Sequence, residues 1–344
     1  MKFFSLSTEQ RHTMKLFTKP HCSIFHTVLR RQCWQMKLFR SWSIKVDDVF
    51  IIGAGPAGMA TAIQLMRYGI NPRVFEKSRP GGLLLNANWV ENYPGFPHGI
   101  SGTDLTHIFI EQIKTISITQ EPVSELSWKD GFYNIVTPIM NYQAKFAVIA
   151  SGTKPKLLTG FSVSDKVKNN IVYDLEKIND QSRKKMIVVG SGDIAFDYAL
   201  NLAKENSVII LNHSDQPKCL KRLHKQAEEH QNITYFPQTR IETVEKSFEG
   251  DMIVECSSPF GLKQFRSDYI VGAIGRDPQI DYILSSVMTH TAEFEKKGIL
   301  HFVGDVKNGL FRQAAIAVGD GIRAGMLIHQ TIEENEHESR RIHK

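Results

Sequence analysis

Apolar runs alternate with glycine-rich turns and with stretches of helical spacing along most of the chain after residue 45. Val46–Ile52 is predicted as a strand, Ala57–Tyr68 as a helix and Pro72–Glu76 as a second short strand. A further apolar strand is predicted at Ala144–Ala150, which closes at Ser151-Gly152. The order of strand, glycine turn, helix and strand is typical of an α/β fold.

The same order returns in the second half of the chain. The two glycine turns, at Gly53 and Gly190, are 137 positions apart. This spacing indicates an internal duplication of one βαβ plan. The elements predicted for the second copy are a strand at Met186–Val189, a helix at Ile194–Ala203 and strands at Ser207–Leu211 and Tyr269–Ile274.

Near the C-terminus the pattern predicts one more strand and a helix. His301–Val303 runs into Gly304-Asp305, and Gln313–Ile328 has helical spacing. The tail from Glu333 onward is charged and is expected to be frayed, with residues 336–344 outside the folded domains. No run of about 18 apolar residues occurs, so no membrane-spanning helix is predicted and the protein is not expected to be an integral membrane protein.

The first glycine turn, Gly53-Ala-Gly55-Pro-Ala-Gly58, has the context that a dinucleotide-binding turn requires, because it follows an apolar strand and opens a helix. Gly53 permits the tight turn, Gly55 lets a pyrophosphate approach the backbone, and Gly58 lets helix and strand pack closely. Glu76, 23 residues after Gly53, ends the second strand and is placed to accept hydrogen bonds from a ribose. The turn therefore predicts an adenine dinucleotide site.

The second turn, Gly190-Ser-Gly192-Asp193-Ile-Ala195, follows the same logic, with alanine at the third small position. The strand after its helix ends near Leu211-Asn212-His213 and carries no acid at its tip. Two interpretations stay open here: a second nucleotide site, or a degenerate one that keeps the fold and has lost the ligand.

Charge is concentrated at the N-terminus. Residues 1–44 contain 8 of the 42 Lys and Arg residues and 1 of the 36 Asp and Glu residues. The rest of the chain is close to neutral, so the basic balance does not predict a nucleic-acid partner. The leader is interpreted as a targeting presequence, as a disordered or membrane-touching arm, or as an upstream extension with initiation at Met14 or Met36. A cytoplasmic location is expected, with organellar targeting as the alternative.

The cysteines and histidines predict neither disulfides nor a metal site. None of the four cysteines, Cys22, Cys33, Cys219 and Cys256, forms a Cys-x-x-Cys pair. The 13 histidines show no spacing typical of metal ligands. We expect no metal and a reducing compartment.

Several further strings occur in a fixed order along the chain: Gly81-Gly82-Leu83, Val90-Glu91-Asn92-Tyr93-Pro94-Gly95-Phe96, Ala150-Ser151-Gly152, Ala273-Ile274-Gly275-Arg276, Gly304-Asp305 and Phe311-Arg312-Gln313-Ala314. Over about residues 45–335, this order resembles the thioredoxin reductase family. The resemblance implies an α/β fold with two Rossmann-like three-layer dinucleotide-binding domains. It implies an FAD domain of residues 45–156 and 270–335, into which an NAD(P) domain of residues 157–269 is inserted, and a homodimer.

The resemblance also assigns roles to individual residues. The pyrophosphate of FAD falls to the first glycine turn, the ribose to Glu76, and the isoalloxazine region to Gly82, Leu83 and Asn92. Asp305 would bind ribityl or phosphate oxygens, and Arg312, Gln313 and Ala314 would line the flavin's pyrimidine edge. The alternative for Asn92 and Gln313 is that their side chains form hydrogen bonds within a turn or cap a helix. No side chain is expected to be catalytic. The complete set of expected cofactor-binding residues is Gly53, Gly55, Pro56, Ala57, Gly58, Glu76, Gly82, Leu83, Asn92, Val123, Gly152, Gly190, Gly192, Asp193, Ile194, Asn212, Gly275, Asp305, Arg312, Gln313 and Ala314.

One departure from the family concerns its chemistry. Thioredoxin reductases carry a Cys-x-x-Cys just before the second glycine turn, whereas this chain has Val172-Tyr173-Asp174-Leu175-Glu176-Lys177. A thiol–disulfide relay needs a thiolate, which a carboxylate cannot replace. This stretch instead resembles the cysteine-free ferredoxin/flavodoxin–NADP reductases of the same architecture.

A second departure concerns nucleotide choice. Relatives that use NADPH carry arginines at the tip of the strand after the second glycine turn, whereas this chain has Asn212-His213-Ser214-Asp215. Lys218, Lys221 and Arg222 lie close by in the sequence, in a run interpreted either as a solvated face or as a contact to a cofactor phosphate. We therefore expect NADPH or NADH as the second cofactor, without a strong preference for NADPH.

Three functions follow as hypotheses. The first is an oxidoreductase that passes hydride from NAD(P)H to FAD and electrons to an unknown external acceptor, either a ferredoxin/flavodoxin-type carrier or another small acceptor. The second is a thioredoxin-reductase-like protein that acts on a partner's thiols. The third is a flavin-binding regulatory protein with little turnover.

Overall fold

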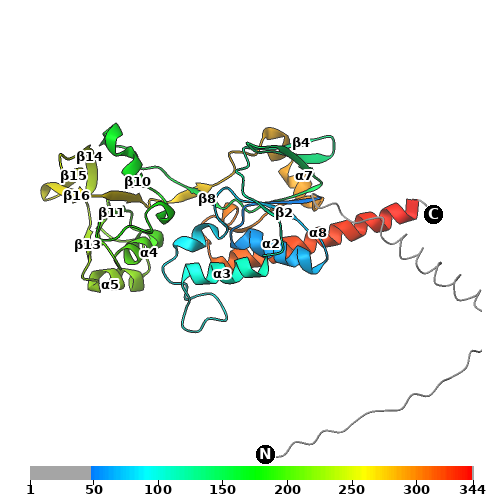
Figure 1. Ribbon diagram of the computed structural model, residues 1–344, viewed down its shortest axis with the longest axis horizontal. Coiled ribbons are helices and arrows are strands. Elements are labelled where there is room, and N and C mark those ends of the chain that lie inside the picture. The colour runs from blue at the N-terminus through cyan, green and yellow to red at the C-terminus, as the bar shows by residue number, and fades with distance from the viewer. Residues whose placement is uncertain (1–47, 343–344) are drawn as a thin grey trace, which may run out of the picture. The chain divides into compact units, whose positions relative to one another are not determined.

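The computed structural model describes residues 48–342 (Figure 1). The predictions made for the leader, residues 1–44, lie outside the described residues. The described chain contains two five-stranded parallel sheets, each with helices on one face and a smaller, mainly antiparallel sheet on the other.

The first sheet has the strand order β19-β7-β1-β2-β3, and all of its pairings are parallel. The late strand β19 pairs with β7, so the chain returns to complete the sheet with which it began. The strands are β1 (Val49–Ile52), β2 (Arg73–Phe75), β3 (Ile118–Thr119), β7 (Phe146–Ile149) and β19 (Leu300–Phe302).

Two different layers cover this sheet. On one side the helices α2 (Pro56–Arg67), α3 (Gly102–Gln112) and α8 (Ala314–Ile342) pack together (Figure 1). On the other side an antiparallel meander packs on the sheet through a core that includes Phe50 and Tyr133, both fully buried. The meander consists of β4 (Glu125–Lys129), β5 (Phe132–Val136) and β6 (Asn141–Ala144), and it is accompanied by the short helices α6 (Ser285–Met288) and α7 (Thr291–Lys296).

The second sheet repeats this plan with the order β10-β17-β11-β12-β13, again entirely parallel. Its strands are β10 (Ile171–Val172), β11 (Lys185–Val189), β12 (Ser207–Leu211), β13 (Ile233–Phe236) and β17 (Tyr269–Gly272). One apolar cluster joins it to the helices α4 (Asp193–Leu202) and α5 (Lys221–Glu229). A separate cluster on the opposite face joins it to β9 (Ser162–Val163), β14 (Arg240–Lys246), β15 (Met252–Ser258) and β16 (Gly261–Ser267).

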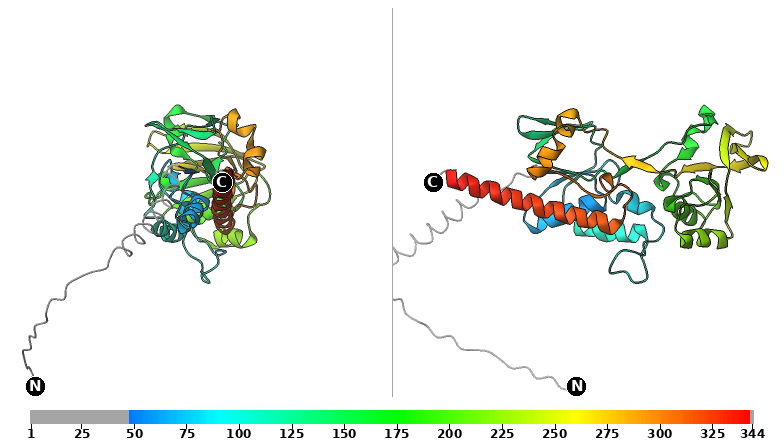
Figure 2. Two further views of the ribbon diagram at one scale, coloured as in Figure 1. Left: turned by 90° about the vertical axis from the view of Figure 1, so that its right-hand side faces the viewer. Right: turned by 180° about the vertical axis from the view of Figure 1, so that it is seen from behind.

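A two-stranded antiparallel ribbon carries the chain between the two sheets in both directions (Figure 2). It pairs β8 (Thr153–Pro155) with β18 (Arg276–Pro278), so that Arg276 lies opposite Pro155. Four short 3₁₀ helices lie in the connections: η1 (Gly82–Asn86), η2 (Asp165–Asn170), η3 (Leu175–Lys177) and η4 (Gly304–Val306).

The strands and helices around both glycine turns agree closely with the prediction. The strand predicted at Ser207–Leu211 is β12 with the same bounds, and the predicted helices at Ala57–Tyr68 and Ile194–Ala203 are α2 and α4, each displaced by one residue. The two meanders and α3 were not predicted. In α3 a signal was present, because the Ser101 hydroxyl caps the helix by accepting from the Asp104 amide.

The frayed tail was a wrong prediction. Helix α8 continues without interruption to Ile342, so the charged residues from Glu333 onward are helical. Side-chain contacts four residues apart explain this: His329 with Glu333, Gln330 with Glu334 and Glu336 with Arg340. Among the described residues, no helix is long and apolar enough to cross a membrane.

Candidate cofactor-binding site

The first glycine turn leaves open space in front of helix α2. Gly53 has φ +108°, and a Cβ there would lie 2.4 Å from the carbonyl oxygen of Ala150. A Cβ at Gly58 would lie 1.9 Å from the carbonyl oxygen of Gly53. At Gly55, by contrast, no heavy atom within residues 48–342, apart from those of its chain neighbours, lies within 4 Å of the Cβ position. Because Pro56 begins the helix there, the opening faces the free amides and positive dipole of a helix N-terminus, which suits a pyrophosphate.

Two carboxylates lie beside this turn. Glu76, only 7% exposed, accepts hydrogen bonds from the amides of Ala54 (2.9 Å) and Ser78 (3.0 Å), which hold it against the turn. Asp305 follows Gly304, where a Cβ would come within 2.8 Å of the Ala57 side chain on the first turn of α2. Burial raises the pKa of Asp305, although Arg312 and Arg276 oppose this shift. Strands β2 and β19 thus deliver the two acids to the same turn.

The segment from Gly81 to Phe96, which we call the predicted flavin loop, lies against the first glycine turn. The Gly81 amide donates to the Ala54 carbonyl (2.8 Å), and the Cβ position of Gly82 lies 3.4 Å from the Gly55 Cα. Further along, the Asn92 amide donates to the Gln313 side-chain oxygen at 2.8 Å. The structure thus joins two predicted flavin residues that are 221 positions apart.

The remaining residues predicted for the flavin side have these positions. Leu83 is half-buried in η1, and Ala314 begins α8. Val123 packs against the apolar cluster that contains Phe75. The Arg312 guanidinium donates to the Arg276 carbonyl at 3.1 Å, while its buried Nε has no hydrogen-bond partner within residues 48–342. The cofactor contacts of these residues stay predictions.

The second glycine turn reproduces the geometry of the first. A Cβ at Gly190 would lie 2.3 Å from the carbonyl oxygen of Ala273, as one at Gly53 would meet Ala150. Beyond its chain neighbours, the Cβ position of Gly192 has no neighbour within 4 Å in the described part of the chain, and α4 begins at the next residue, Asp193. The two turns therefore share the same close backbone contacts, as the predicted duplication implies. The second turn also offers an opening at a helix N-terminus.

At the tip of β12 the structure corrects one expectation. The side chain of Asn212 is fully buried; its Nδ2 donates to the Gln216 carbonyl and the Tyr235 hydroxyl, and its oxygen accepts from the Ser214 amide. All its polar atoms are used inside the turn, so the amide supports the turn and does not face a ribose.

The segment after this tip crosses the second glycine turn. The Lys218 amide donates to the Ser191 carbonyl at 2.7 Å, and the Leu220 amide donates to the Asp193 carboxylate at 2.8 Å. The side chain of Arg222 forms an ion pair with Glu91 at 2.6 Å, in the predicted flavin loop. The basic run Lys218–Lys225 therefore lies beside the turn, with Arg222 already engaged.

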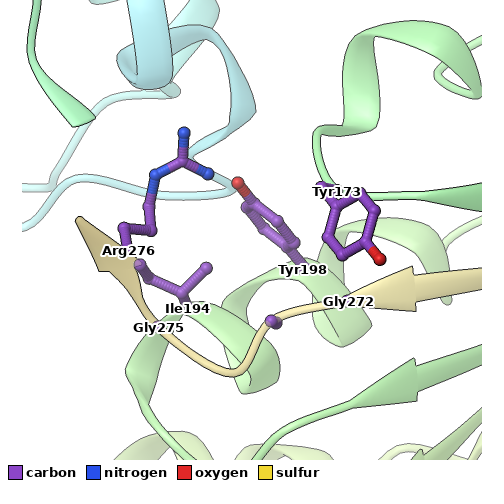
Figure 3. A pocket seen from close by; sticks show the side chains of 7 residues that line it. Tyr173, Ile194, Tyr198, Gly272, Gly275 and Arg276 are labelled. Atoms are coloured by element: carbon purple, nitrogen blue, oxygen red, sulfur yellow. The ribbon is translucent and has the colours of Figure 1, made fainter. Parts of the chain in front are cut away.

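A small pocket lies where α4 begins and β17 ends (Figure 3). Figure 3 shows the Arg276 guanidinium and the Tyr198 hydroxyl pointing toward each other, with the Tyr173 ring beside Tyr198. Two of the predicted residues, Ile194 and Gly275, line this pocket. Gly275 is the counterpart of Gly152 in the first half, and both have positive φ. The lining residues are Tyr173, Ile194, Tyr198, Gly272, Ala273, Gly275 and Arg276.

Residues 172–177, which stand where thioredoxin reductases carry the Cys-x-x-Cys, are held by two ion pairs. Asp174 accepts from the Arg276 guanidinium at 3.1 Å, and Glu176 forms an ion pair with Arg79 at 3.2 Å. Cys219 packs on the helix side of the second sheet and the fully buried Cys256 on the opposite side, so they cannot pair. Burial raises the pKa of Cys256 to about 12.

Sequence reasoning missed the polar contacts between α4 and the flavin loop. The Asn86 side chain donates to the Tyr198 hydroxyl at 3.4 Å, and the Asn88 amide donates to the Asp197 carboxylate at 3.0 Å. Their partners are more than 100 positions apart, and nothing in the local sequence marks them. Within the described residues, no group of His, Cys, Asp and Glu side chains is arranged to hold a metal ion.

Comparison with known proteins agrees with this geometry. The model of the pyridine nucleotide-disulphide oxidoreductase family matches residues 47–321. The chain belongs to this family. It is 28% identical to a thioredoxin reductase of Mycolicibacterium smegmatis over 86% of this chain and all of that protein. It is 27% identical to a 34.2 kDa protein in the rubredoxin operon of Clostridium pasteurianum, over 83% of this chain and 97% of the relative.

Solved structures agree on the fold. The thioredoxin reductase of Lactococcus lactis in its FR conformation superposes with a TM-score of 0.73 at 23% identity, covering 83% of this chain and 99% of that one. Family membership confirms an FAD- and NAD(P)H-dependent oxidoreductase of thioredoxin reductase architecture. The α/β fold with two Rossmann-like domains is also confirmed.

Proposed function

We propose that this protein takes hydride from NAD(P)H onto FAD and passes the electrons to an external acceptor, either a ferredoxin/flavodoxin-type carrier or another small acceptor. One observation carries the proposal: both glycine turns keep an opening for a dinucleotide, while the segment that would hold a thiol relay carries Asp174 and Glu176 in ion pairs. This combination supports binding of both cofactors without a thiol relay in residues 172–177, which contain no cysteine.

The residues at the first turn fit FAD. Gly55 offers the opening for the pyrophosphate, Glu76 an acceptor for ribose hydroxyls, and Asp305 a partly buried carboxylate for ribityl oxygens. Gln313 and the unpaired Nε of Arg312 offer polar atoms for the pyrimidine edge. When bound, FAD would supply the redox chemistry, and the chain supplies binding, orientation and electrostatics.

The second turn fits the pyrophosphate of NAD(P)H, with Gly192 at the opening and Asp193 and Ile194 in the first turn of α4. We assign the FAD domain to residues 45–156 and 270–335, and the NAD(P) domain to residues 157–269. We also propose a homodimer, which light scattering on the purified protein tests directly.

The second candidate function is action on the thiols of a partner. It is favoured by relatives such as the M. smegmatis protein, which carries the name thioredoxin reductase. Within residues 48–342, Cys219 and Cys256 lie on opposite faces of a sheet and cannot form a thiol relay, so we propose that such a reaction would pass from the flavin to the partner's disulfide.

Stopped-flow spectroscopy with the purified, FAD-loaded protein tests the proposal. We expect NADH or NADPH to bleach the flavin, and a ferredoxin or flavodoxin to reoxidise it faster than a thioredoxin disulfide. Faster reoxidation by the disulfide protein would favour the second candidate. Absence of bleaching by either nucleotide would overturn both and leave a flavin-binding regulatory protein.

A double variant tests whether the two thiols within residues 48–342 take part in this activity. In the variant with both Cys219→Ser and Cys256→Ser, we expect dye reduction driven by NAD(P)H to stay within about twofold of the wild type, because a thiolate relay needs two neighbouring sulfurs. Loss of dye reduction in a folded, flavin-loaded double variant would show that one of these thiols takes part.

A further inference from the structure

Helix α5 carries its charges in the order that the helix dipole opposes. Lys221 and Arg222 occupy its first turn, where the dipole favours acids. Glu228 and Glu229 occupy its last turn, where bases are favoured. Its N-cap residue, Leu220, has no side-chain oxygen to accept from the free amides. Within residues 48–342, the other four helices of eight or more residues each have an acid in the first turn or a base in the last. Such departures from local preference are expected at functional surfaces.

The start of α5 presents an exposed basic surface. Residues 216–227 contain four Lys and Arg residues and no Asp or Glu. Lys221 and Lys225 are both exposed and, being four residues apart, lie on the same side of the helix. Leu220, next to them in the chain, is 63% exposed. The helix packs on α4 and β13 through its other side, where Ala227 is buried (Figure 1). We call the following residues the α5 patch: Lys218, Leu220, Lys221, Arg222 and Lys225.

Two of the four cations of the α5 patch have no acid beside them. Lys218 and Lys221 form no ion pair with the residues that the structure describes. Lys225 lies 3.6 Å from Glu229, but both side chains are exposed, so water screens this pair. Surface charge of one sign speeds the arrival of an oppositely charged protein and orients it. The patch therefore suits an acidic protein surface.

The fourth cation joins the α5 patch to the predicted flavin loop. The Arg222 guanidinium forms an ion pair with Glu91 at 2.6 Å. The next residue of the loop, Asn92, donates to the Gln313 side chain at 2.8 Å, at the edge that is predicted to line the flavin. A protein docked on the patch would therefore lie beside the loop that borders this edge.

We propose that the α5 patch is the docking surface for a small acidic electron-carrier protein that accepts electrons from the flavin. The inference rests on the proposed function, because it assumes that reduced FAD passes its electrons to a carrier. Two molecules of a one-electron carrier take the two electrons of one reduced flavin, and the flavin's proton passes to water. The unfavourable charges at the start of α5 are then explained, because they act on the partner and not on the helix.

Lys221→Glu tests the contribution of charge. The flavin is reduced with NADH, and its reoxidation by a ferredoxin of strongly negative net charge is followed by stopped flow. At about 0.01 M salt, where the Debye length is about 30 Å, we expect the second-order rate constant to fall about tenfold. At about 1 M salt, where that length is about 3 Å, variant and wild type should agree within about twofold. Reoxidation by benzoquinone, an uncharged small acceptor, should not change.

Leu220→Ser tests the apolar contact. We expect its rate constant with ferredoxin to fall about threefold at both salt concentrations, because salt does not screen the contact of an apolar side chain. Both substitutions suit the helix better than the wild-type residues do, since serine is a preferred N-cap and glutamate is favoured in the first turn. Tm should therefore stay the same or rise. A slower reaction in an equally stable protein distinguishes lost docking from a damaged fold.

Matched controls make the same changes elsewhere on the surface. Lys129→Glu reverses the charge of an exposed residue at the end of β4. Leu262→Ser replaces a leucine that is 83% exposed on β16. Both controls should react with ferredoxin at the wild-type rate.

The outcomes separate this inference from the proposed function. If ferredoxin reoxidises the wild type and both α5 variants at the same rate, the proposed function stands and the docking surface is wrong. If Lys221→Glu instead weakens only the binding of NADPH, the patch binds the 2′-phosphate of the nucleotide, which also overturns the inference. If benzoquinone reoxidises the wild type but neither ferredoxin nor flavodoxin does, the acceptor is a small molecule and no carrier docks.

A failure of the hydride step is recognised separately. If NADH does not bleach the wild-type flavin, the proposed function fails. The flavin is then reduced by light in the presence of EDTA, and the same comparison of Lys221→Glu with Lys129→Glu still decides whether the α5 patch receives the carrier.

Discussion

At the scale of single residues, the two open glycines carry the most specific expectations. Gly55 and Gly192 have equivalent places in the two turns, and at each a Cβ would meet no other described residue within 4 Å beyond its chain neighbours. Neither has a positive φ, so a side chain at either position strains no backbone. A substitution there should leave the fold intact and act only on a ligand that enters the opening.

We therefore predict that Gly55→Val yields a folded protein without FAD, because the branched side chain occupies the place of the pyrophosphate. Gly192→Val is the matched control: it should keep the yellow flavin spectrum but lose bleaching by NAD(P)H. Visible absorbance of the purified variants and circular dichroism measure both. A Gly55→Val protein that retains its flavin would contradict the assignment of the first turn.

Asp197 gives a prediction about pH. Burial raises its pKa from 3.8 to about 6, although the Asn88 amide and Lys204 act in the opposite direction and Asp193 adds to the rise. For an acid with a raised pKa, the folded state is most favoured below the unfolded value and loses that contribution as the pH rises through the folded value. The ionised, buried carboxylate therefore destabilises the folded protein above about pH 6.

Asp197→Asn should remove this penalty, because the neutral amide still accepts from the Asn88 amide. A shift of about two units corresponds to at most about 3 kcal/mol. We expect the variant to be more stable than the wild type at about pH 8 and to lose that advantage at about pH 3, below the unfolded pKa of 3.8. Thermal unfolding across this range measures it, with Asp180→Asn as the control. An advantage that does not vary with pH would show that the carboxylate is not the cause.

At the scale of elements, structure set by neighbouring residues was predicted correctly, whereas contacts between residues far apart in the sequence were not. The strands and helices around Gly53 and Gly190 were predictable because the glycine pattern and the apolar runs are local signals. The contacts that complete the site were not. Tyr198 with Asn86 and Asp174 with Arg276 join residues 112 and 102 positions apart, and only the folded ribbon brings them together.

The tip of β12 shows the same limit for a single side chain. Asn212 was expected to bind the cofactor because it stands at the end of the strand after the second glycine turn. Its amide is instead taken up by three hydrogen bonds within the turn, which no local pattern reveals. The exposed residues left at the tip are His213 and Asp215.

The residues at the tip of β12 predict little selectivity for NADPH over NADH. A 2′-phosphate needs a fixed cation at the tip. His213 is the exposed candidate there, Asp215 is negative, and Arg222 is paired with Glu91. We expect kcat/KM for NADPH to exceed that for NADH by less than about a hundredfold, which corresponds to roughly 2.7 kcal/mol.

The variant that tests this is His213→Arg, which supplies a fixed cation at the tip and should shift the NADPH/NADH ratio toward NADPH by about tenfold. Gln226→Arg adds the same charge on the exposed surface of α5 and should leave the ratio unchanged. A wild-type preference for NADPH beyond about a hundredfold would show that another cation, such as Lys218, reaches the phosphate.

At the scale of the whole molecule, the excess of positive charge lies before the first described strand. Strand β1 begins at Val49, and every predicted cofactor residue lies between Gly53 and Ala314. The first 44 residues carry a net charge of +7, so a chain that begins at Lys45 has a net charge of −1 in place of +6. The two forms should therefore differ in their electrostatic behaviour far more than in their binding of cofactors.

We predict that the shortened chain keeps its FAD as tightly as the full chain. The reason is that the opening at Gly55 and the acids Glu76 and Asp305 are held by hydrogen bonds and packing among residues 53–305. The measurement is the ratio of FAD to protein after extensive dialysis of both forms, together with the rate of flavin bleaching by NAD(P)H. On cation exchange only the full chain should be retained near neutral pH, since its excess of positive charge comes from residues 1–44. If the shortened chain is folded but loses its flavin, the leader contributes to the FAD site and the boundary of the FAD domain at residue 45 is wrong.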